Sequence, residues 1–509
     1  MDLELVRVPI TTYREVFCGN SEQPIDLDIS LPDYCPDIAR ILKCQVAPQI
    51  TARTIVGDRL TVEGSAIIRV FYADEERGAL RCCELSSAFS ADFNLRTAPE
   101  LPSVFTETRV DFMNCRAVTK RRVDIHCAFT ITAHVYGTQR QEVLTAAHGG
   151  GVRVRSAEVP ACEHVGAVQQ PITVDEEFTL ESGRTPPETI LRFCADGRIT
   201  DVRTVANRVM VKGEFCIHVL YSTDAVTGQT DTVEYTVPFS QILDMEGLDD
   251  RCRCDARLEL LSMQVQLNEA DGGQVAFEAE LRGAVCVIAM KPRTVCVLLD
   301  AYSTDYETTL ERADIQFTEA DAPLKRTLIA RGTLPDGAAG TRVLDAWSEP
   351  RGVTASCKDG KLELSGRICA ALILCGDDGK ASYQETLLDL ADSSDWAKAN
   401  AEFNPRLHID RMSYRVNGAG RMEVQAETTV ECSALTTSRH NVVAQITADT
   451  EHPKEKDPQC AMTLYYAEKG EAVWEIARRY NTTQEAIQTE NNLSADQIEE
   501  DGMLFIPAV

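Results

Sequence analysis

One strand-like stretch occurs three times in the chain at nearly constant spacing. Its copies are residues 60–72 (LTVEGSAIIRVFY), 209–221 (VMVKGEFCIHVLY) and 362–374 (LELSGRICAALIL). Apolar residues occupy alternate positions in each copy, which is the pattern of a β-strand with one buried face. The fifth residue is always a glycine, namely Gly64, Gly213 and Gly366. A glycine inside a strand marks a bulge or a close approach of another backbone segment, so we expect one of these in each copy.

A second pattern repeats with the same spacing and tests the repeat independently. It is an arginine followed by a short apolar segment, and it starts at Arg109, Arg257 and Arg406. Both patterns recur about every 150 residues, which is a common domain size. We therefore predict three homologous modules, at residues 1–150, 151–300 and 301–448.

Turn residues between short strands predict the fold of each module. Such a succession favours an antiparallel sandwich or barrel, so we expect a mainly β chain with three tandem β-sandwich-like modules. Residues 31–42 are the exception, because Pro36 suits a first helical turn. The residues that would share one face of this helix are Ile38, Ile41 and Leu42. We expect a short helix here, a counterpart at residues 334–344 in the third module and an altered one near residues 187–191 in the second.

Length and charge limit the class of protein. A chain of 509 residues is too long for one hydrophobic core. Its 51 basic and 79 acidic residues give a net charge of −28. We therefore expect neither nucleic acid, which requires a basic surface, nor an anionic membrane surface as a partner. The charge favours solubility through self-repulsion.

The nineteen cysteines are scattered singly through apolar strands. The closest groups are Cys82-Cys83 and the pair Cys252 and Cys254, neither with a histidine nearby. Because a structural zinc site needs four ligands at recognisable spacing, we expect no metal site. Buried free thiols that act as small apolar side chains are the favoured interpretation.

The N-terminal residues and the hydropathy pattern predict a cytoplasmic location. Residues 1–17 lack a basic region followed by an apolar segment, so we expect no signal peptide. The longest apolar run, residues 284–290, is far shorter than the roughly 20 residues of a membrane span. Abundant thiols fit the same reducing compartment.

Two segments are predicted to connect domains. The run Gly149–Gly151 is interpreted as a flexible joint before the second module, and it lacks the Gly-Lys-Ser/Thr continuation of a phosphate-binding loop. Residues 449–461 include two prolines and several charges without apolar periodicity. We expect this second segment to be a linker.

Residues 462–509 differ in kind from the modules. A short strand is predicted at residues 463–466 and a closing strand at residues 503–506. Between them, a helix is predicted from four residues on one helical face, Val473, Ile476, Ala477 and Tyr480. Thr482 with Glu485 fits a capping box that starts a second helix. The expected order is strand, helix, helix, strand.

This C-terminal segment is similar to a LysM domain. The similarity runs through KGEAVWEIA (469–477), YNT (480–482), NNL (491–493) and GMLFIP (502–507). LysM domains generally bind N-acetylglucosamine-containing glycans, such as peptidoglycan, in a shallow groove between two loops. The resemblance implies that this groove contains Gly470, Glu471, Ala472, Val473, Leu493 and Ile498.

The C-terminal segment departs from the LysM pattern in two ways. Ala472 occupies a position where a serine or threonine hydroxyl is common, and acidic residues outnumber basic ones. Both departures weaken the expectation of ordinary glycan binding. Trp474 is interpreted as a packing residue in preference to a sugar-stacking one, because aromatic side chains dominate small cores.

The three modules resemble the SPOCS domain of spore-forming bacteria. The resemblance rests on LPDYCPD (31–37) and on residues 62–72. Three SPOCS domains followed by one LysM domain is the layout of a family of spore-coat morphogenetic proteins of the clostridia. Members help attach the coat to the forespore by binding the ATPase that forms the basement layer of the coat. The resemblance implies a location in the mother-cell cytoplasm, at the forespore surface.

Motifs for catalysis are absent from the sequence. We find no serine-hydrolase elbow, zinc-protease helix or nucleotide-binding loop. Acidic pairs such as Glu75-Glu76 sit in polar, turn-like stretches, whereas an acid–base pair needs one carboxyl in an apolar pocket. His126 and His218 lie on predicted strands, where a structural role is the default. We expect no catalytic residues and no cofactor.

Two functional hypotheses remain. The first is a non-enzymatic scaffold of spore-coat assembly. In it the SPOCS modules engage envelope partners, such as the basement-layer ATPase and other coat proteins, and the LysM domain docks a protein through the groove that its relatives use for glycan. The second is a peptidoglycan-binding protein of the cell wall or cortex, which requires access to the wall. An enzyme with an unrecognised site is a third, weaker alternative. Tandem β modules favour the first hypothesis, because they offer several strand edges and faces for protein contacts.

Overall fold

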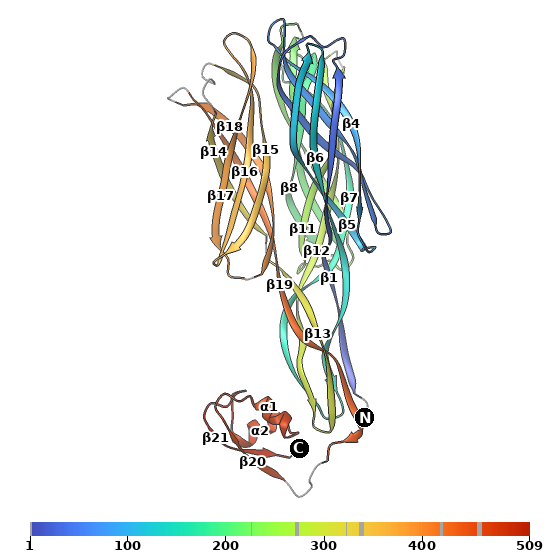
Figure 1. Cartoon of the computed structure of the whole chain (residues 1–509), viewed down its shortest axis with the longest axis vertical. Coiled ribbons are helices and arrows are strands. Elements are labelled where there is room, and N and C mark those ends of the chain that lie inside the picture. The colour runs from blue at the N-terminus through green and yellow to red at the C-terminus, as the bar shows by residue number, and fades with distance from the viewer. Residues whose placement is uncertain are drawn as a thin grey trace.

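The predicted fold class is confirmed. The computed structural model describes residues 3–224, 226–269, 274–321, 323–334, 341–398, 400–417, 421–455 and 461–508. Three tandem β modules lie side by side, and their long terminal strands continue into a narrow stalk (Figure 1). A small domain with two helices lies at the far end of the stalk.

The first module is a sandwich of two three-stranded antiparallel sheets. Its strands are β1 (Glu4–Ser30), β2 (Ile38–Val56), β3 (Arg59–Asp74), β4 (Leu80–Asn94), β5 (Glu100–Thr119) and β6 (Arg122–His148). One sheet has the order β2-β3-β4 and the other has the order β1-β6-β5. The core lies between the sheets, where side chains such as Val62 and Ile68 from β3 meet Val123 and Phe129 from β6.

The second module repeats this plan and the third modifies it. The second contains β7 (Val152–Thr179), β8 (Thr189–Val205), β9 (Arg208–Asp224), β10 (Gln229–Asp244), β11 (Arg253–Glu269) and β12 (Val275–Ser303). The third contains β13 (Tyr306–Ala320), β14 (Leu324–Thr333), β15 (Arg342–Lys358), β16 (Lys361–Cys375), β17 (Ala381–Asp395), β18 (Ala401–Val416) and β19 (Met422–Pro453). Both β13 and β14 pair with β19, so two strands replace the single first strand of the other modules. The interruption between β13 and β14 includes Pro323, which has no backbone N–H to donate to a neighbouring strand.

The three repeated stretches form the middle strands β3, β9 and β16, and the expected close approach at their glycines is confirmed. Each glycine faces a bulge in the neighbouring strand, where the register shifts. A Cβ atom on Gly64 would lie 2.1 Å from the carbonyl oxygen of Gln49. A Cβ atom on Gly213 would lie 2.5 Å from the carbonyl oxygen of Arg198. A side chain therefore does not fit beside the bulge.

The seventh residue after each glycine joins the modules to one another. These residues are Phe71, Leu220 and Ile373, all fully buried. They point away from their own sandwich cores and meet in one apolar cluster, which also contains Trp347. The repeat thus specifies both a module core and a shared contact between modules.

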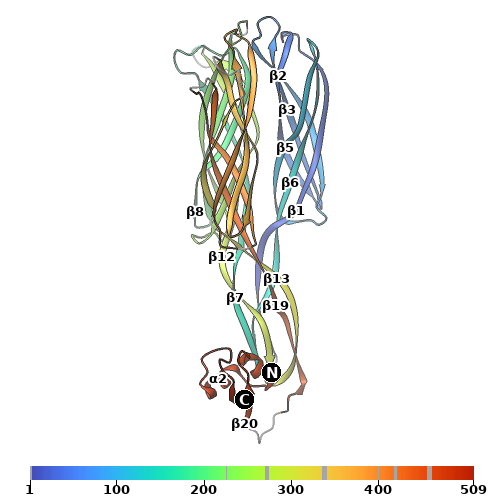
Figure 2. The same ribbon diagram turned by 60° about the vertical axis from the view of Figure 1, so that its left-hand side comes forward.

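The stalk consists of three two-stranded ribbons that wrap around a common core (Figure 2). The ribbons are the outer parts of β1 with β6, β7 with β12, and β13 with β19. Ile10, Val159 and Phe317, one from each module, are buried in this core. Each ribbon is too narrow to bury its own apolar face, so the three depend on one another.

The helix expected at residues 31–42 is wrong. Residues 33–35 form a turn and β2 begins at Ile38. Two bulges interrupt the start of β2, between Ile38 and Arg40 and between Ile41 and Lys43. Each bulge inserts one extra residue between apolar positions. The apolar residues therefore no longer alternate, and their spacing resembles that of a helix. The second and third modules have strands with similar bulges near Ile190 and Val343.

Both connecting segments differ from expectation. Gly149–Gly151 forms a tight turn with positive φ at all three residues, not a flexible joint. It is held by hydrogen bonds from Ser303 and Thr304 to the carbonyl groups of Gly150 and Gly151. The predicted linker begins later than residue 449, because β19 continues to Pro453. Residues 456–460 lie outside the described residues.

The cysteines within the described residues are all free thiols, as predicted. Most are buried or half-buried, and three are exposed: Cys18, Cys216 and Cys357.

Candidate functional site

The C-terminal domain has the predicted order of strand, two helices and strand. Its elements are β20 (Met462–Ala467), α1 (Val473–Arg479), α2 (Gln484–Asn491) and β21 (Gly502–Pro507). Val473, Ile476 and Ala477 are buried in a core that also contains Ile487 and Ile506. The helix pattern predicted for α1 is therefore confirmed.

The start of α2 is one residue later than predicted. Thr483 is the N-cap, and its hydroxyl accepts a hydrogen bond from the backbone N–H of Ala486 at 3.0 Å. Thr482 instead donates its hydroxyl to the carbonyl oxygen of Pro507 at 2.7 Å. The helix ends at Asn491, and the next residue, Asn492, adopts the left-handed conformation expected of a C-terminal cap.

The two loops predicted to form the groove lie side by side. The backbone N–H of Gly470 donates to the carbonyl oxygen of Ile498 at 2.8 Å, and the N–H of Ile498 donates to Glu471 at 2.9 Å. The N–H of Val473 donates to Asp496 at 2.9 Å. Here, "loop groove" means residues 470–473 and 493–498. The structure brings the predicted residues together, and their binding role stays a prediction.

The side chains of the loop groove differ in accessibility. Gly470 is exposed with φ of 93°, a conformation that favours glycine. Glu471, Ala472 and Leu493 are half-buried. Val473 and Ile498 are 0% and 4% exposed, so these two side chains belong to the domain core. They shape the groove through their backbone.

The carboxylate of Glu471 is already engaged within the domain. The Tyr465 hydroxyl donates to its two oxygens at 2.9 and 3.1 Å. The backbone N–H of Glu468 also donates to it at 3.1 Å. The bond to Glu471 raises the pKa of Tyr465. This acid therefore fixes the first loop in place.

One face of the domain is docked on the end of the stalk. Asp300 of β12 accepts hydrogen bonds from the indole N–H of Trp474 at 2.9 Å and from Arg478 at 3.2 Å. The Tyr302 hydroxyl donates to the carbonyl oxygen of Thr482 at 2.8 Å. Trp474 is 6% exposed and lies edge-on to the Tyr302 ring. Its predicted packing role is confirmed, and no sequence pattern indicated Asp300 or Tyr302 as its partners.

The opposite side of the domain carries an exposed apolar surface. Alternate residues of β20 and β21 point away from the helices, and their exposed fractions are Met462 43%, Leu464 59%, Tyr466 58%, Met503 54% and Phe505 46%. Leu464 faces Phe505 and Tyr466 faces Met503 across the strand pair. We call these five residues the apolar sheet face. Contiguous exposed apolar patches of this kind mark interaction sites.

Acidic side chains surround one end of this surface. Glu468 follows β20, and Glu500 and Asp501 precede β21, all of them exposed. MTLYYA and GMLFIP are apolar at nearly every position, so both faces of each strand are apolar. This lack of a polar face could have indicated the surface from sequence.

The comparisons with known proteins match this architecture. The family model described as "SipL, SPOCS domain" matches residues 37–118 and 186–268, and the LysM domain model matches residues 465–507. The chain therefore contains two segments that match the SPOCS domain and one that matches the LysM domain. No curated protein and no solved structure matched the chain.

The two SPOCS matches coincide with a structural unit. They cover β2 to β5 in the first module and β8 to β11 in the second. The strands that form the stalk lie largely outside the matched segments. SPOCS and LysM domains together indicate a sporulation-related protein with a peptidoglycan-binding type of module.

Both kinds of domain are non-catalytic binding modules. A cysteine, a histidine and an aspartate lie close together between the second and third modules, beside a cavity of about 700 Å³. Cys194 and His218 are cross-strand neighbours, and Asp345 lies 2.8 Å from Nε2 of His218. The other ring nitrogen of His218 lies 3.5 Å from Glu234, so both nitrogens face carboxylates. Burial raises the pKa of the Cys194 thiol, which opposes its use as a nucleophile.

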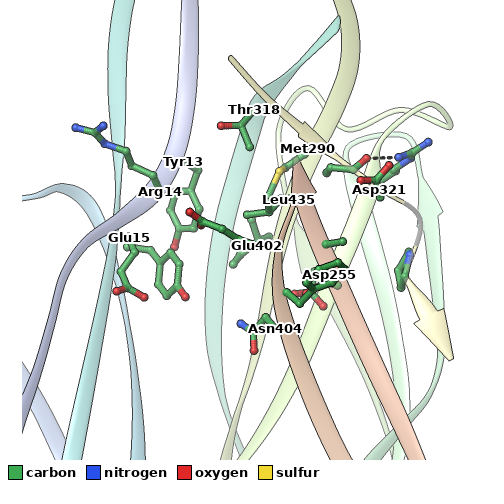
Figure 3. A pocket seen from close by; sticks show the side chains of 18 of the residues that line it. Tyr13, Arg14, Glu15, Asp255, Met290, Thr318, Asp321, Glu402, Asn404 and Leu435 are labelled. Carbon is green, nitrogen blue, oxygen red and sulfur yellow. Dashed lines mark hydrogen bonds between the residues drawn. The ribbon is translucent and has the colours of Figure 1, made fainter. Parts of the chain in front are cut away.

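A second cavity, of about 620 Å³, lies where the three modules meet above the stalk (Figure 3). Tyr13 and Glu15 of the first module line one side. Asp255 of the second module and Glu402 and Asn404 of the third line the other.

In the part of the chain that the structure describes, no helix is long and apolar enough to cross a membrane.

Proposed function

We propose that the protein is a non-enzymatic scaffold of spore-coat assembly whose LysM domain docks a coat protein through the apolar sheet face. The observation that carries this proposal is the row of five exposed apolar side chains on β20 and β21. Their cross-strand pairs form a continuous surface of the kind that becomes the buried centre of a protein interface. The partner is the ATPase that forms the basement layer of the coat, in line with the resemblance to spore-coat morphogenetic proteins.

The charge of the LysM domain supports a protein partner over a glycan. Acidic residues at the end of the apolar sheet face, such as Glu468 and Asp501, would complement a basic rim on the partner. Peptidoglycan carries carboxylates of its own, and these acids would repel it. The stalk supports the same role, because it holds the LysM domain away from the three sandwiches (Figure 1), and the sheet face stays exposed.

Binding by the purified full-length chain tests the proposal. Leu464→Glu and Phe505→Glu place charges on the apolar sheet face without changing the domain core. We expect each variant to bind the basement-layer ATPase at least about 30-fold more weakly, because a buried interface anchor contributes about 2 kcal/mol or more. Ser494→Trp crowds the exposed second loop of the loop groove and serves as the control, with unchanged ATPase binding. Unchanged binding by both sheet-face variants would refute the docking surface.

Peptidoglycan binding is the second candidate function, and the side-by-side loops of the loop groove favour it. Sedimentation of the same chains with purified peptidoglycan distinguishes the two. The scaffold proposal predicts that the wild-type chain stays in the supernatant. Sedimentation that Ser494→Trp abolishes and Leu464→Glu preserves would establish glycan recognition instead.

A further inference from the structure

A cluster of metal-ligating side chains lies on the first module, where the stalk meets the sandwich. Glu15 and Cys18 of β1 and His134 of β6 each offer one ligand atom, and these atoms all lie within 4.8 Å of one another. Nδ1 of His134 lies 3.1 Å from the Glu15 carboxylate. Glu15 also lines the cavity between the modules (Figure 3).

A β-bulge creates this cluster. In a regular strand, residues three apart point to opposite faces of the sheet. The register between β1 and β6 shifts between Glu15 and Phe17, and the extra residue is Val16. Glu15 and Cys18 therefore point to the same face, and Cys18 pairs directly with His134. The ligands come from distant parts of the sequence, so cysteine spacing could not indicate them.

The electrostatic surroundings of the cluster favour a cation. Glu15 and Glu107 both line the cavity together with His134, so carboxylates lie on the cavity side of the cluster. Arg14 alternates with Glu15 along β1 and points away from it (Figure 3). Across the cavity, Arg257 lies over the Phe105 ring at 4.7 Å and pairs with Asp255. The carboxylates of Glu15 and Glu107 therefore make the surroundings of the cluster acidic.

We propose that Glu15, Cys18 and His134 bind a Zn²⁺ ion. A thiolate, an imidazole and a carboxylate are the three ligand types that zinc takes in proteins, and three protein ligands leave a fourth position for water or another group. Glu107, which also lines the cavity, offers a carboxylate for that position. Zinc binding would fasten β1 to β6 where both strands leave the sandwich for the stalk.

The second module lacks this site. The second module has the corresponding bulge between Ala289 and Met290. There, the residues equivalent to Glu15, Cys18 and His134 are His164, Ala167 and Ile288. The second module thus keeps the backbone feature but lacks the ligands.

Metal titration of the untagged, full-length chain tests the proposal. We expect a single Zn²⁺ ion to bind per chain in competition with a chromophoric chelator, and Co²⁺ to give a thiolate charge-transfer band. Cys18→Ser should abolish the band, and both Cys18→Ser and His134→Ala should weaken Zn²⁺ binding by more than about tenfold. Binding should tighten as the pH rises, because the thiol must lose its proton.

Two matched variants serve as controls. Cys216→Ser removes another exposed cysteine, and His126→Ala removes an exposed histidine that also contacts two carboxylates, Asp26 and Asp124. Both should bind zinc as the wild type does. Absence of a thiolate band with Co²⁺, or a Cys18→Ser chain that binds Zn²⁺ as tightly as wild type, would overturn the proposal.

Discussion

At the scale of single residues, the repeat glycines show how a sequence pattern specifies a backbone contact. The pattern predicted a bulge or close approach, and the structure places a bulge opposite each glycine. The contacts are not equally tight. The nearest atom to a Cβ on Gly366 would be 3.0 Å away, compared with 2.1 Å for Gly64.

Alanine substitution of the repeat glycines should therefore have graded effects. Gly64→Ala should lower the free energy of unfolding of the first module by about 1–3 kcal/mol, because backbone or the Phe89 ring must move. Gly366→Ala should lower the free energy of unfolding of the third module by a smaller amount. Chemical denaturation with hydrogen exchange resolves the modules, and Ser65→Ala, on the same strand, is the control. Equal costs for Gly64→Ala and Gly366→Ala would contradict this explanation.

His164 is a buried titratable group at the contact between the first two modules. Its ring stacks on Tyr13 at 4.5 Å, and the side chain is 8% exposed. Burial lowers the pKa of His164 to about 4. An unfolded histidine titrates near 6.5, so between about pH 6.5 and 4 the unfolded chain binds a proton that the folded chain does not. Stability therefore falls as the pH falls through this range.

His164→Phe should flatten this pH dependence, since it keeps the stacking on Tyr13 and removes the titration. We expect the denaturation midpoint of the wild type to fall more than that of the variant between pH 7 and pH 5. Comparable decreases of the denaturation midpoint in both proteins would show that His164 does not contribute to the pH dependence of stability.

The candidate site shows which residues a sequence can predict. The loop-groove residues follow one another closely in the chain, so a family pattern locates them. Asp300 and Tyr302, which hold Trp474, lie in another module and have no local signal. Cys18 and His134 are adjacent only because β1 pairs with β6.

At the scale of elements, bulges explain why a helix is wrongly predicted at residues 31–42. The start of β2 contains two bulges within a few residues, so its apolar residues follow a helix-like spacing. The strands β3, β9 and β16 carry apolar residues at alternate positions, and their sequence pattern predicts them correctly. Periodicity alone does not separate the bulged start of a strand from a short helix.

The cap of α2 gives a test at this scale. Thr483→Val keeps the shape of the side chain but removes the acceptor for the Ala486 N–H, at a cost of about 1 kcal/mol. We expect the α2 amides to exchange about five times faster in this variant. Thr483→Ser retains the hydroxyl and should exchange as the wild type does. If hydrogen exchange of the α2 amides were unchanged in Thr483→Val, the side chain of Thr483 would not be the N-cap that stabilises α2.

At the scale of the whole molecule, the stalk makes the three modules interdependent. Each module contributes one ribbon to a shared core, and the ends of the ribbons hold the LysM domain. Module repetition was evident in the sequence. The shared core was not, because the alternation of β1, β7 and β13 indicates a buried face without showing that three modules bury it together.

Truncation of a shared core residue should affect all three modules. Phe317 of β13 is 1% exposed and packs in the cluster that contains Ile10 and Val159. Phe317→Ala should lower the free energy of unfolding by about 3–5 kcal/mol. It should also increase hydrogen exchange in the stalk strands of every module. Faster exchange confined to the third module would mean that the ribbons are independent.

The most direct test of the central claim is the location of the full-length chain in sporulating cells. A fluorescent fusion of the wild type and of Ser494→Trp should form a ring around the forespore. Leu464→Glu should remain diffuse in the mother cell at equal abundance, because the apolar sheet face no longer binds its partner. A ring formed by Leu464→Glu and Phe505→Glu would contradict docking through this face.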